Sequence, residues 1–207
     1  MTDKKIQWFK WITELQAAAQ SGLTYCTNEF DIERYIKIRE IAAQMAAECS
    51  SNTFEVINDL FSLDKGYATP KLDIRGVILK DKKLLLVRER ADGLWSLPGG
   101  WADVNESPSE AIAREVKEES GYEVRVLRLL SLWDKLKHDH PLQWPHTYKC
   151  FFHCELTGGE ARENLEVSEI DFFGLDHLPP LSTPRITEKQ LLRLYELVHN
   201  SELTEFD

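Results

Sequence analysis

Three glutamates, Glu115, Glu118 and Glu119, recur at the spacing i, i+3 and i+4. In a helix this spacing places all three carboxylates on one face. Carboxylates crowded in this way repel one another, so the cluster calls for a compensating cation, and all-oxygen ligands suit Mg²⁺ or Mn²⁺. The spacing therefore predicts a divalent-metal site that could hydrolyse a metal-bound diphosphate.

The residues around the glutamates predict a short helix with defined ends. Ser107 can cap its N-terminus, Pro108 suits the first helical position and Glu110 completes a capping box. Gly121 is a matching stop signal. The apolar side that would pack on a sheet consists of Ala111, Ile112 and Val116. We expect this packing to turn the glutamates toward the site.

The segment before this helix predicts a strand followed by a loop. Residues 94–97 are mainly apolar and precede Pro98, and Gly99 and Gly100 then permit a tight turn or a close approach of the backbone to a ligand. Arg114 lies beside the glutamates in the sequence and can pair with Glu106. We expect this pair to fix the loop that holds Gly100 against the helix.

The whole segment resembles the Nudix box in every fixed position. Tyr122 is the one departure, because the pattern usually has an aliphatic residue there and the position serves packing rather than chemistry. The matching residues are Gly100, Glu106, Arg114, Glu115, Val116, Glu118, Glu119 and Gly121. The resemblance implies hydrolysis of a phosphoric anhydride.

The resemblance also implies roles for single residues. Glu115, Glu118 and Glu119, with the Gly100 carbonyl, would hold Mg²⁺ or Mn²⁺, and Glu115, Glu118 and Arg114 would serve catalysis. The roles implied for Gly100, Glu106 and Gly121 within the motif are structural. The proton acceptor is either a glutamate of the box or a carboxylate on a separate loop. A run after Gly158 and Gly159 offers four such carboxylates, Glu160, Glu163, Glu166 and Glu169. If one of them enters the site, Glu166 is our choice; the alternative for all four is a solvated loop face.

Substrate-binding residues are less marked in the sequence. Arg75 and Arg88 lie on expected strands that lead toward the box and could contact phosphate, although they could equally be surface arginines. The segment 133–146 contributes Lys137 and His146, together with aromatic side chains that could stack on a base. The alternative for this segment is a loop packed at a dimer contact.

Composition limits the classes of partner. The 207 residues include 25 Lys and Arg against 35 Asp and Glu, which gives a net charge of −10. This charge argues against broad binding to a nucleic-acid backbone. We find neither an apolar run of membrane length nor the apolar core of a secretory signal, so we expect no membrane association and a cytoplasmic location.

The cysteines predict neither a disulfide nor a catalytic site. Cys150 and Cys154 fall in the run TYKCFFHCEL, where alternation places them on one face of a strand. Residues four apart on one strand are too distant to form a disulfide. We expect buried, reduced cysteines, with zinc binding as the minor alternative.

The hydrophobic pattern changes near residue 65 and divides the chain. The pattern predicts three helices within residues 1–66. The first ends at Ser21-Gly22, the second begins at Asp31 and the third covers 54–63. The first carries an apolar stripe that consists of Trp8, Ile12, Leu15 and Ala19. From residue 71 the pattern favours strands, with a turn at 81–83 between 72–80 and 84–90, a strand or hairpin over 122–133 and 146–157, and a closing helix over 185–200.

These elements predict an α/β fold in which a Nudix-like mixed sheet lies between helices, residues 67–207, preceded by a small all-α domain, residues 1–66. The helical segment resembles the N-terminal extension of a Nudix subgroup that hydrolyses nucleoside diphosphates linked to a second group, X. The resemblance implies a homodimer and a substrate such as CDP-choline or ADP-ribose. The alternatives are a nucleoside triphosphate pyrophosphohydrolase, an RNA-directed hydrolase and a nucleotide sensor without catalysis.

Overall fold

The computed structural model describes residues 3–50, 52–200 and 203–207. Its residues divide into two compact units, Met1–Pro70 and Lys71–Asp207. Within the described ranges no helix is both long and apolar enough to cross a membrane. Each unit has its own core and is described separately below.

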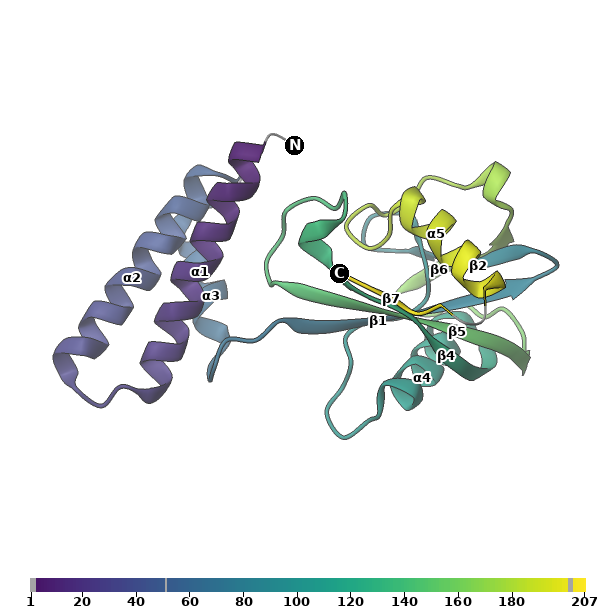
Figure 1. Ribbon diagram of the computed structural model, residues 1–207, viewed down its shortest axis with the longest axis horizontal. Coiled ribbons are helices and arrows are strands. Elements are labelled where there is room, and N and C mark those ends of the chain that lie inside the picture. Colours follow the sequence, from purple (N-terminus) through teal and green to yellow (C-terminus); the bar gives the residue numbers. More distant parts are fainter. Residues whose placement is uncertain (1–2, 51, 201–202) are drawn as a thin grey trace. The chain divides into compact units, whose positions relative to one another are not determined.

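The first unit consists of three helices, which are α1 (Asp3–Tyr25), α2 (Glu29–Glu48) and α3 (Phe54–Leu63) (Figure 1). Ile12 and Ala19 of the expected stripe are buried, whereas Trp8 and Leu15 remain exposed. Gln16 and Gln20 are buried instead and are joined by a 2.9 Å hydrogen bond between their side chains. The inward face of α1 is therefore partly polar.

Two helix ends in this unit differ from the sequence prediction. The first helix does not stop at Ser21-Gly22 but continues to Tyr25. A Cβ on Gly22 would lie 2.3 Å from the Tyr35 ring of α2, so this glycine serves close helix packing rather than termination. The second helix begins at Glu29 rather than Asp31, because the Asn28 side chain caps the amides of Phe30 and Asp31.

The second unit contains seven strands and two longer helices. The strands are β1 (Lys71–Lys80), β2 (Lys83–Glu89), β3 (Trp95–Ser96), β4 (Tyr122–Asp134), β5 (Thr147–Gly159), β6 (Val167–Phe173) and β7 (Glu205–Phe206). The helices are α4 (Pro108–Ser120) and α5 (Glu188–His199), with short 3₁₀ turns η1 (Lys135–Lys137) and η2 (Leu175–His177). The strand β6 includes Glu169, whereas the sequence predicts that this residue lies in a loop after Gly158 and Gly159.

The strands form one mixed sheet, in the order β3-β2-β1-β5-β4-β7, with β6 paired to β2. The expected hairpin is confirmed: Lys80 pairs with Lys83 across Asp81 and Lys82, which both have positive φ. Strands β4 and β5 pair antiparallel, whereas β1 and β5 pair parallel. The register of β1 and β5 places Asp73 beside Lys149.

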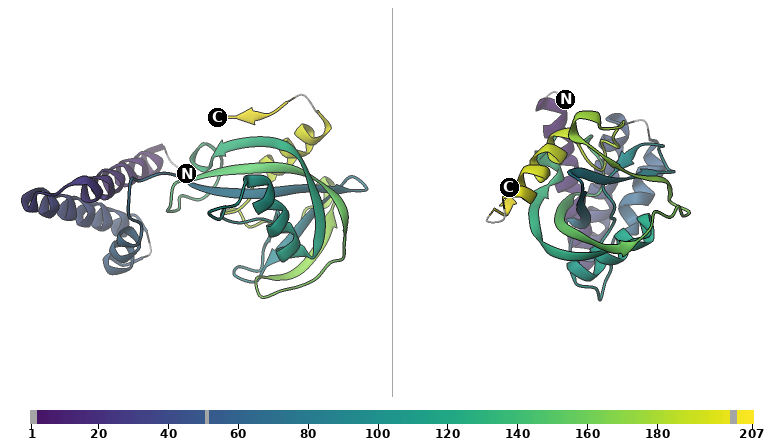
Figure 2. Two further views of the ribbon diagram at one scale, coloured as in Figure 1. Left: turned by 90° about the horizontal axis from the view of Figure 1, so that it is seen from below. Right: turned by 90° about the vertical axis from the view of Figure 1, so that its right-hand side faces the viewer.

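The sheet is covered on both faces, as the sequence predicts (Figure 1). Helix α4 packs on one face through Ala111, Ile112 and Val116, next to the buried Cys150 and Cys154 of β5. Helix α5 packs on the other face through its leucines, against Trp133 and Phe151. Figure 2 shows the long strands β4 and β5 curving round α4. The expected burial holds for Cys150 and Cys154, whereas Cys26 is partly exposed and Cys49 is exposed; all four are free cysteines.

Candidate active site

Helix α4 carries the three glutamates and has the ends that the sequence predicts. The Ser107 side chain and Glu110 form a reciprocal capping box, Pro108 starts the helix, and Gly121 ends it with φ +77°. Glu119 is 6% exposed, Glu115 is half-buried and Glu118 points to solvent. The three carboxylates therefore span the helix face from the protein interior to its surface.

The loop 97–102 lies against strand β1 and faces this helix. Backbone hydrogen bonds join it to β1, with Gly76 N donating to Pro98 O at 2.9 Å and Ile74 N donating to Gly100 O at 2.8 Å. The Gly99 amide donates a 2.8 Å hydrogen bond to Oε2 of Glu119. A Cβ on Gly99 would lie 2.1 Å from the Ile74 carbonyl oxygen, so only glycine fits here.

Arg114 holds the other two glutamates of α4. Its Nη1 donates to Glu115 Oε1 at 3.0 Å and to Glu118 Oε2 at 2.8 Å. Its Nε donates to both carboxylate oxygens of Glu106 at 3.0 Å, which is the ion pair expected from the sequence. Asp103 is a fourth carboxylate in contact with this guanidinium. Arg114 thus neutralises the acidic cluster and ties the loop to the helix.

Burial changes the acidity of the inner glutamates. Burial raises the pKa of Glu119 to about 8, although the charge of Arg75 and the Gly99 hydrogen bond act in the opposite direction. Burial also raises the pKa of Glu115, against the opposing charge of Arg114. These carboxylates are poorly compensated as anions, which is the electrostatic setting that a bound cation would relieve.

The donor set at this site fits a hard divalent cation. A Cβ on Gly100 would lie 3.2 Å from Glu115 Oε2, so the backbone at Gly100 comes close to a carboxylate of α4, and carboxylate and carbonyl oxygens are the donors that such a cation prefers. In the described part of the chain, no three acidic, histidine or cysteine side chains already converge on one point. Glu115 and Glu118 are turned to Arg114 instead, so cation binding requires them to rotate away from the guanidinium.

The loop that carries Glu166 is fastened to the C-terminal end of α4. Asn164 Nδ2 donates to the Glu118 carbonyl at 2.5 Å, and Asn164 Oδ1 accepts from the amides of Glu166 and Val167. The Arg162 amide donates to the Ser120 carbonyl at 3.0 Å. The Glu166 side chain is exposed, and among the described residues no ion pair holds its carboxylate. The loop that carries this exposed carboxylate is thus fixed to the C-terminal end of the glutamate helix.

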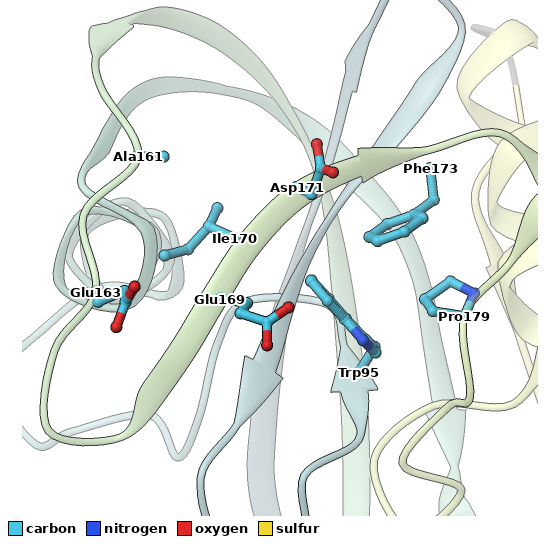
Figure 3. Close-up of a pocket in the computed structure, with 8 residues that line it drawn as sticks. All are labelled: Trp95, Ala161, Glu163, Glu169, Ile170, Asp171, Phe173 and Pro179. Carbon is cyan, nitrogen blue, oxygen red and sulfur yellow. The ribbon is translucent and has the colours of Figure 1, made fainter.

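Two other expected carboxylates of this run, those of Glu163 and Glu169, are paired with arginines. Glu163 and Glu169 line a pocket of about 530 Å³ together with Trp95. Figure 3 shows these side chains around the pocket. Arg90 pairs with Glu163 at 3.1 Å, and Arg88 pairs with Glu169. Both carboxylates are therefore committed to arginines, whereas that of Glu166 is not.

The two arginines expected to bind substrate differ in their surroundings. Arg75 is 6% exposed, and it donates from Nε to Asp73 at 2.7 Å and from Nη1 to the Leu97 carbonyl at 3.0 Å. Arg88 is half-exposed; besides its pair with Glu169, its Nε donates to the Gly93 carbonyl at 2.8 Å. The structure thus places Arg75 beside the glycine loop, whereas Arg88 pairs with Glu169, which lines the pocket described above.

Lys137 and His146 lie at the end of β4, away from the glutamate helix in the fold. Lys137 is exposed in η1 and lines a cavity of about 320 Å³ together with Trp133, Lys189 and Arg193. His146 Nε2 contacts Asp134 Oδ1 at 3.0 Å. The structure therefore does not gather the four expected substrate contacts around one point.

Two buried charged residues near the site escaped the sequence analysis. Asp73 is 8% exposed and Lys149 is fully buried, and the two form an ion pair between β1 and β5. Each lies in an apolar strand segment, so its charge is explained only by the oppositely charged partner on the adjacent strand. The sequence signal for this pair is the presence of charged residues within two apolar strand segments, Asp and Arg in LDIRGV and Lys in TYKCFF.

Comparison with known families covers almost the whole chain. Residues 6–61 match the family model described as a UDP-X-like N-terminal oligomerisation domain, and residues 70–195 match that of the NUDIX domain. A Bacillus subtilis protein assigned provisionally as an ADP-ribose pyrophosphatase is 41% identical over 208 residues, covering 100% of both chains.

Two solved structures resemble the chain closely. A UDP-X diphosphatase superposes with a TM-score of 0.63 at 33% identity and covers 98% of each chain. An ADP-ribose pyrophosphatase from Streptococcus suis superposes with a TM-score of 0.61 at 45% identity, and the match covers 67% of this chain and 100% of that one. The likeness therefore extends over both units.

Proposed function

The chain belongs to the Nudix family of pyrophosphohydrolases, and on that premise we propose that it cleaves a nucleoside diphosphate linked to a second group, with ADP-ribose as the first candidate substrate. ADP-ribose is favoured over CDP-choline because two relatives that resemble this chain are described as ADP-ribose pyrophosphatases. The products would be AMP and ribose 5-phosphate.

One structural observation carries the proposal. The glycine loop is held against the glutamate helix by the hydrogen bond from the Gly99 amide to Glu119. This contact supports a ligand set made of the Gly100 carbonyl and the carboxylates of Glu115, Glu118 and Glu119. These four residues would hold a divalent metal ion, and when bound, the ion would neutralise diphosphate oxygens and lower the pKa of a water molecule.

The chain's own residues supply the remaining chemistry. Glu166 accepts the proton of the attacking water, since its carboxylate is unpaired on a loop fixed to α4. A glutamate of α4 is the alternative base. Arg114 supports catalysis by anchoring the loop through Glu106, and it neutralises Glu115 and Glu118 until a cation replaces it. The attack breaks one phosphoanhydride bond, and the leaving group departs as a phosphate monoester.

Substrate contacts are assigned by access and charge. Arg88, Lys137 and His146 have accessible side chains that could bind a phosphate or the terminal ribose. Arg75 is buried, and two of its nitrogens donate hydrogen bonds to Asp73 and to the Leu97 carbonyl. We therefore assign it a structural role at the glycine loop rather than a substrate contact. A variant of any accessible residue that raises KM without lowering kcat would identify a substrate contact.

We also propose that residues 1–66 assemble a homodimer and that residues 67–207 carry the activity. The matched family model describes the first segment as an oligomerisation domain. Trp8, Trp11 and Leu15 recur along α1 at helical spacing and are each more than a third exposed. Large apolar side chains grouped in this way are typical of a surface that a second copy covers.

A product assay tests the proposed reaction. ADP-ribose, CDP-choline, UDP-sugars and nucleoside triphosphates are each incubated with Mg²⁺, with Mn²⁺ and with EDTA, and the products are separated by chromatography. We expect AMP and ribose 5-phosphate from ADP-ribose, and no product with EDTA. Release of inorganic pyrophosphate from a triphosphate as the dominant activity would instead assign the enzyme to nucleotide-pool cleansing.

A further inference from the structure

A buried ionic cluster lies beneath the glycine loop, on the face of the sheet opposite α4. Asp73 Oδ1 accepts a 2.7 Å hydrogen bond from Arg75 Nε, and Asp73 Oδ2 accepts one from Lys149 Nζ. The exposed fractions are 8% for Asp73, 6% for Arg75 and 0% for Lys149. Lys149 also lies over the Phe151 ring, with Nζ 5.8 Å from its centroid. The proposed reaction uses none of these charges directly.

Such a cluster is costly, because the free energy lost by desolvating charged groups can exceed the free energy gained by pairing them. Two cations share one carboxylate here, so the cluster carries a surplus positive charge. Besides Asp73, the carboxylates that interact electrostatically with Arg75 include those of Glu119, Glu89 and Glu115. Glu89 already pairs with Arg185 at 3.1 Å. The positive charge of Arg75 favours the charged form of Glu119, the most buried glutamate of α4, and opposes the effect of burial on its pKa.

The cluster is also joined to the glycine loop by direct contacts. Arg75 Nη1 donates to the Leu97 carbonyl at 3.0 Å, at the start of the loop. The two residues that flank Arg75 on β1 bond to the loop as well, through Ile74 N to Gly100 O and Gly76 N to Pro98 O. The loop in turn bonds to Glu119 through the Gly99 amide. An unbroken path of contacts thus runs from Lys149 to Glu119.

We propose that Lys149 and Asp73 are positioning residues for the metal site, which hold Arg75 so that Arg75 fixes the glycine loop that bonds to Glu119. This inference rests on the proposed function, because it takes Glu119 as a metal ligand. Neither residue touches the substrate. Outer residues that orient metal ligands typically contribute roughly 10–100-fold to metal affinity or activity.

Direct Mn²⁺ binding to the full-length protein tests this role. Lys149→Met and Asp73→Asn are titrated with Mn²⁺ and the free ion is followed by electron paramagnetic resonance, while thermal unfolding is recorded without metal. The matched control is Cys154→Ala, which removes a 1% exposed side chain from the same strand without touching the cluster. Glu119→Gln gives the reference for a lost ligand.

We expect the Mn²⁺ dissociation constant to rise roughly tenfold or more in both cluster variants and to stay unchanged in Cys154→Ala. The Mg²⁺ concentration needed for half-maximal activity should rise in parallel, with KM for ADP-ribose unchanged at saturating Mg²⁺. A purely structural cluster would instead lower the unfolding temperature and leave Mn²⁺ affinity at the wild-type value, which would overturn the inference.

A second variant covers the case in which single substitutions do not fold. Asp73→Leu, Arg75→Met and Lys149→Met together replace the cluster by apolar side chains, a change that buried ion clusters often tolerate. We expect this protein to fold and to bind Mn²⁺ weakly; wild-type affinity would overturn the inference. Wild-type protein that binds Mn²⁺ but hydrolyses no substrate refutes only the proposed reaction, whereas absence of Mn²⁺ binding refutes both.

Discussion

The Gly99 amide donates a 2.8 Å hydrogen bond to Oε2 of Glu119, and this bond joins the glycine loop to the glutamate helix. It is one of the few groups that stabilise the buried Glu119 carboxylate as an anion. The protein therefore keeps a charged ligand at a position where burial opposes the charge, and this arrangement has measurable consequences for stability and for activity.

Glu119→Gln should stabilise the metal-free protein at alkaline pH. Because burial raises the folded-state pKa of Glu119 from 4.5 to about 8, the stability linked to its protonation is complete below pH 4.5 and is lost as the pH rises toward 8. Glutamine does not titrate. At pH 9 with EDTA we expect the variant to be more stable by about 2 kcal/mol, or roughly 4–8 °C in Tm, and this gain should shrink toward pH 5.

The matched control for this experiment is Glu118→Gln on the same helix, whose side chain is 60% exposed. It should show no comparable gain that grows with pH. If the difference in stability between Glu119→Gln and wild type is the same at pH 5 and pH 9, the buried Glu119 anion does not destabilise the metal-free protein.

Arg114→Gln should destabilise the metal-free protein more than the metal-loaded one. Without the guanidinium, Glu106, Glu115 and Glu118 lose their shared partner, and the two helix glutamates repel each other. We expect a loss of about 1–3 kcal/mol measured by urea unfolding in EDTA. Mg²⁺ should restore part of this loss, because the ion neutralises the same carboxylates. An equal loss with and without Mg²⁺ would argue against a cation at these carboxylates.

Glu166→Gln should lower kcat without weakening metal binding. Removal of a general base typically costs roughly 10²–10⁴-fold in rate, and glutamine preserves the size of the side chain. Steady-state kinetics at saturating Mg²⁺ and a Mn²⁺ titration measure the two effects separately. The control is Glu163→Gln on the same loop, whose carboxylate pairs with Arg90. Equal rates for Glu166→Gln and wild type would move the base to a glutamate of α4.

Trp11→Glu should convert a dimer into monomers. The side chain is 46% exposed and packs edge-to-face on Trp8, with ring centroids 5.4 Å apart. A carboxylate placed in an apolar interface is costly to bury. Sedimentation velocity measures the change, and Lys10→Glu adds the same negative group to an exposed position of the same helix. If the wild-type protein sediments as a monomer, residues 1–66 do not form a dimer in solution.

The sequence predicts the glutamate helix closely because each of its signals is local. The capping residues Ser107 and Glu110, the stop at Gly121 and the ion pair between Arg114 and Glu106 all act within a few turns of chain. The same holds for the hairpin at Asp81 and Lys82. Local signals of this kind do not depend on how distant segments pack.

The features that the sequence analysis missed depend on distant partners. From the sequence, Gly22 is predicted to end the first helix. In the structure it instead allows the ring of Tyr35 to pack closely against that helix. Strand β6 is hidden because its outward glutamates resemble those of a solvated loop, and only its pairing with β2 reveals the strand. Lys149 sits in an apolar run, and its charge is explained only by Asp73 on the neighbouring strand.

The most direct test of the central claim is the rate of AMP release from ADP-ribose by wild-type and Glu119→Gln proteins, both verified as folded, at saturating Mg²⁺ and again in EDTA. The account predicts steady release by the wild type, complete loss of release in EDTA, and a decrease of roughly 10²-fold or more in the variant. AMP release by folded Glu119→Gln at the wild-type rate, or undiminished release in EDTA, would contradict the assignment of this helix and loop as a metal-dependent active site.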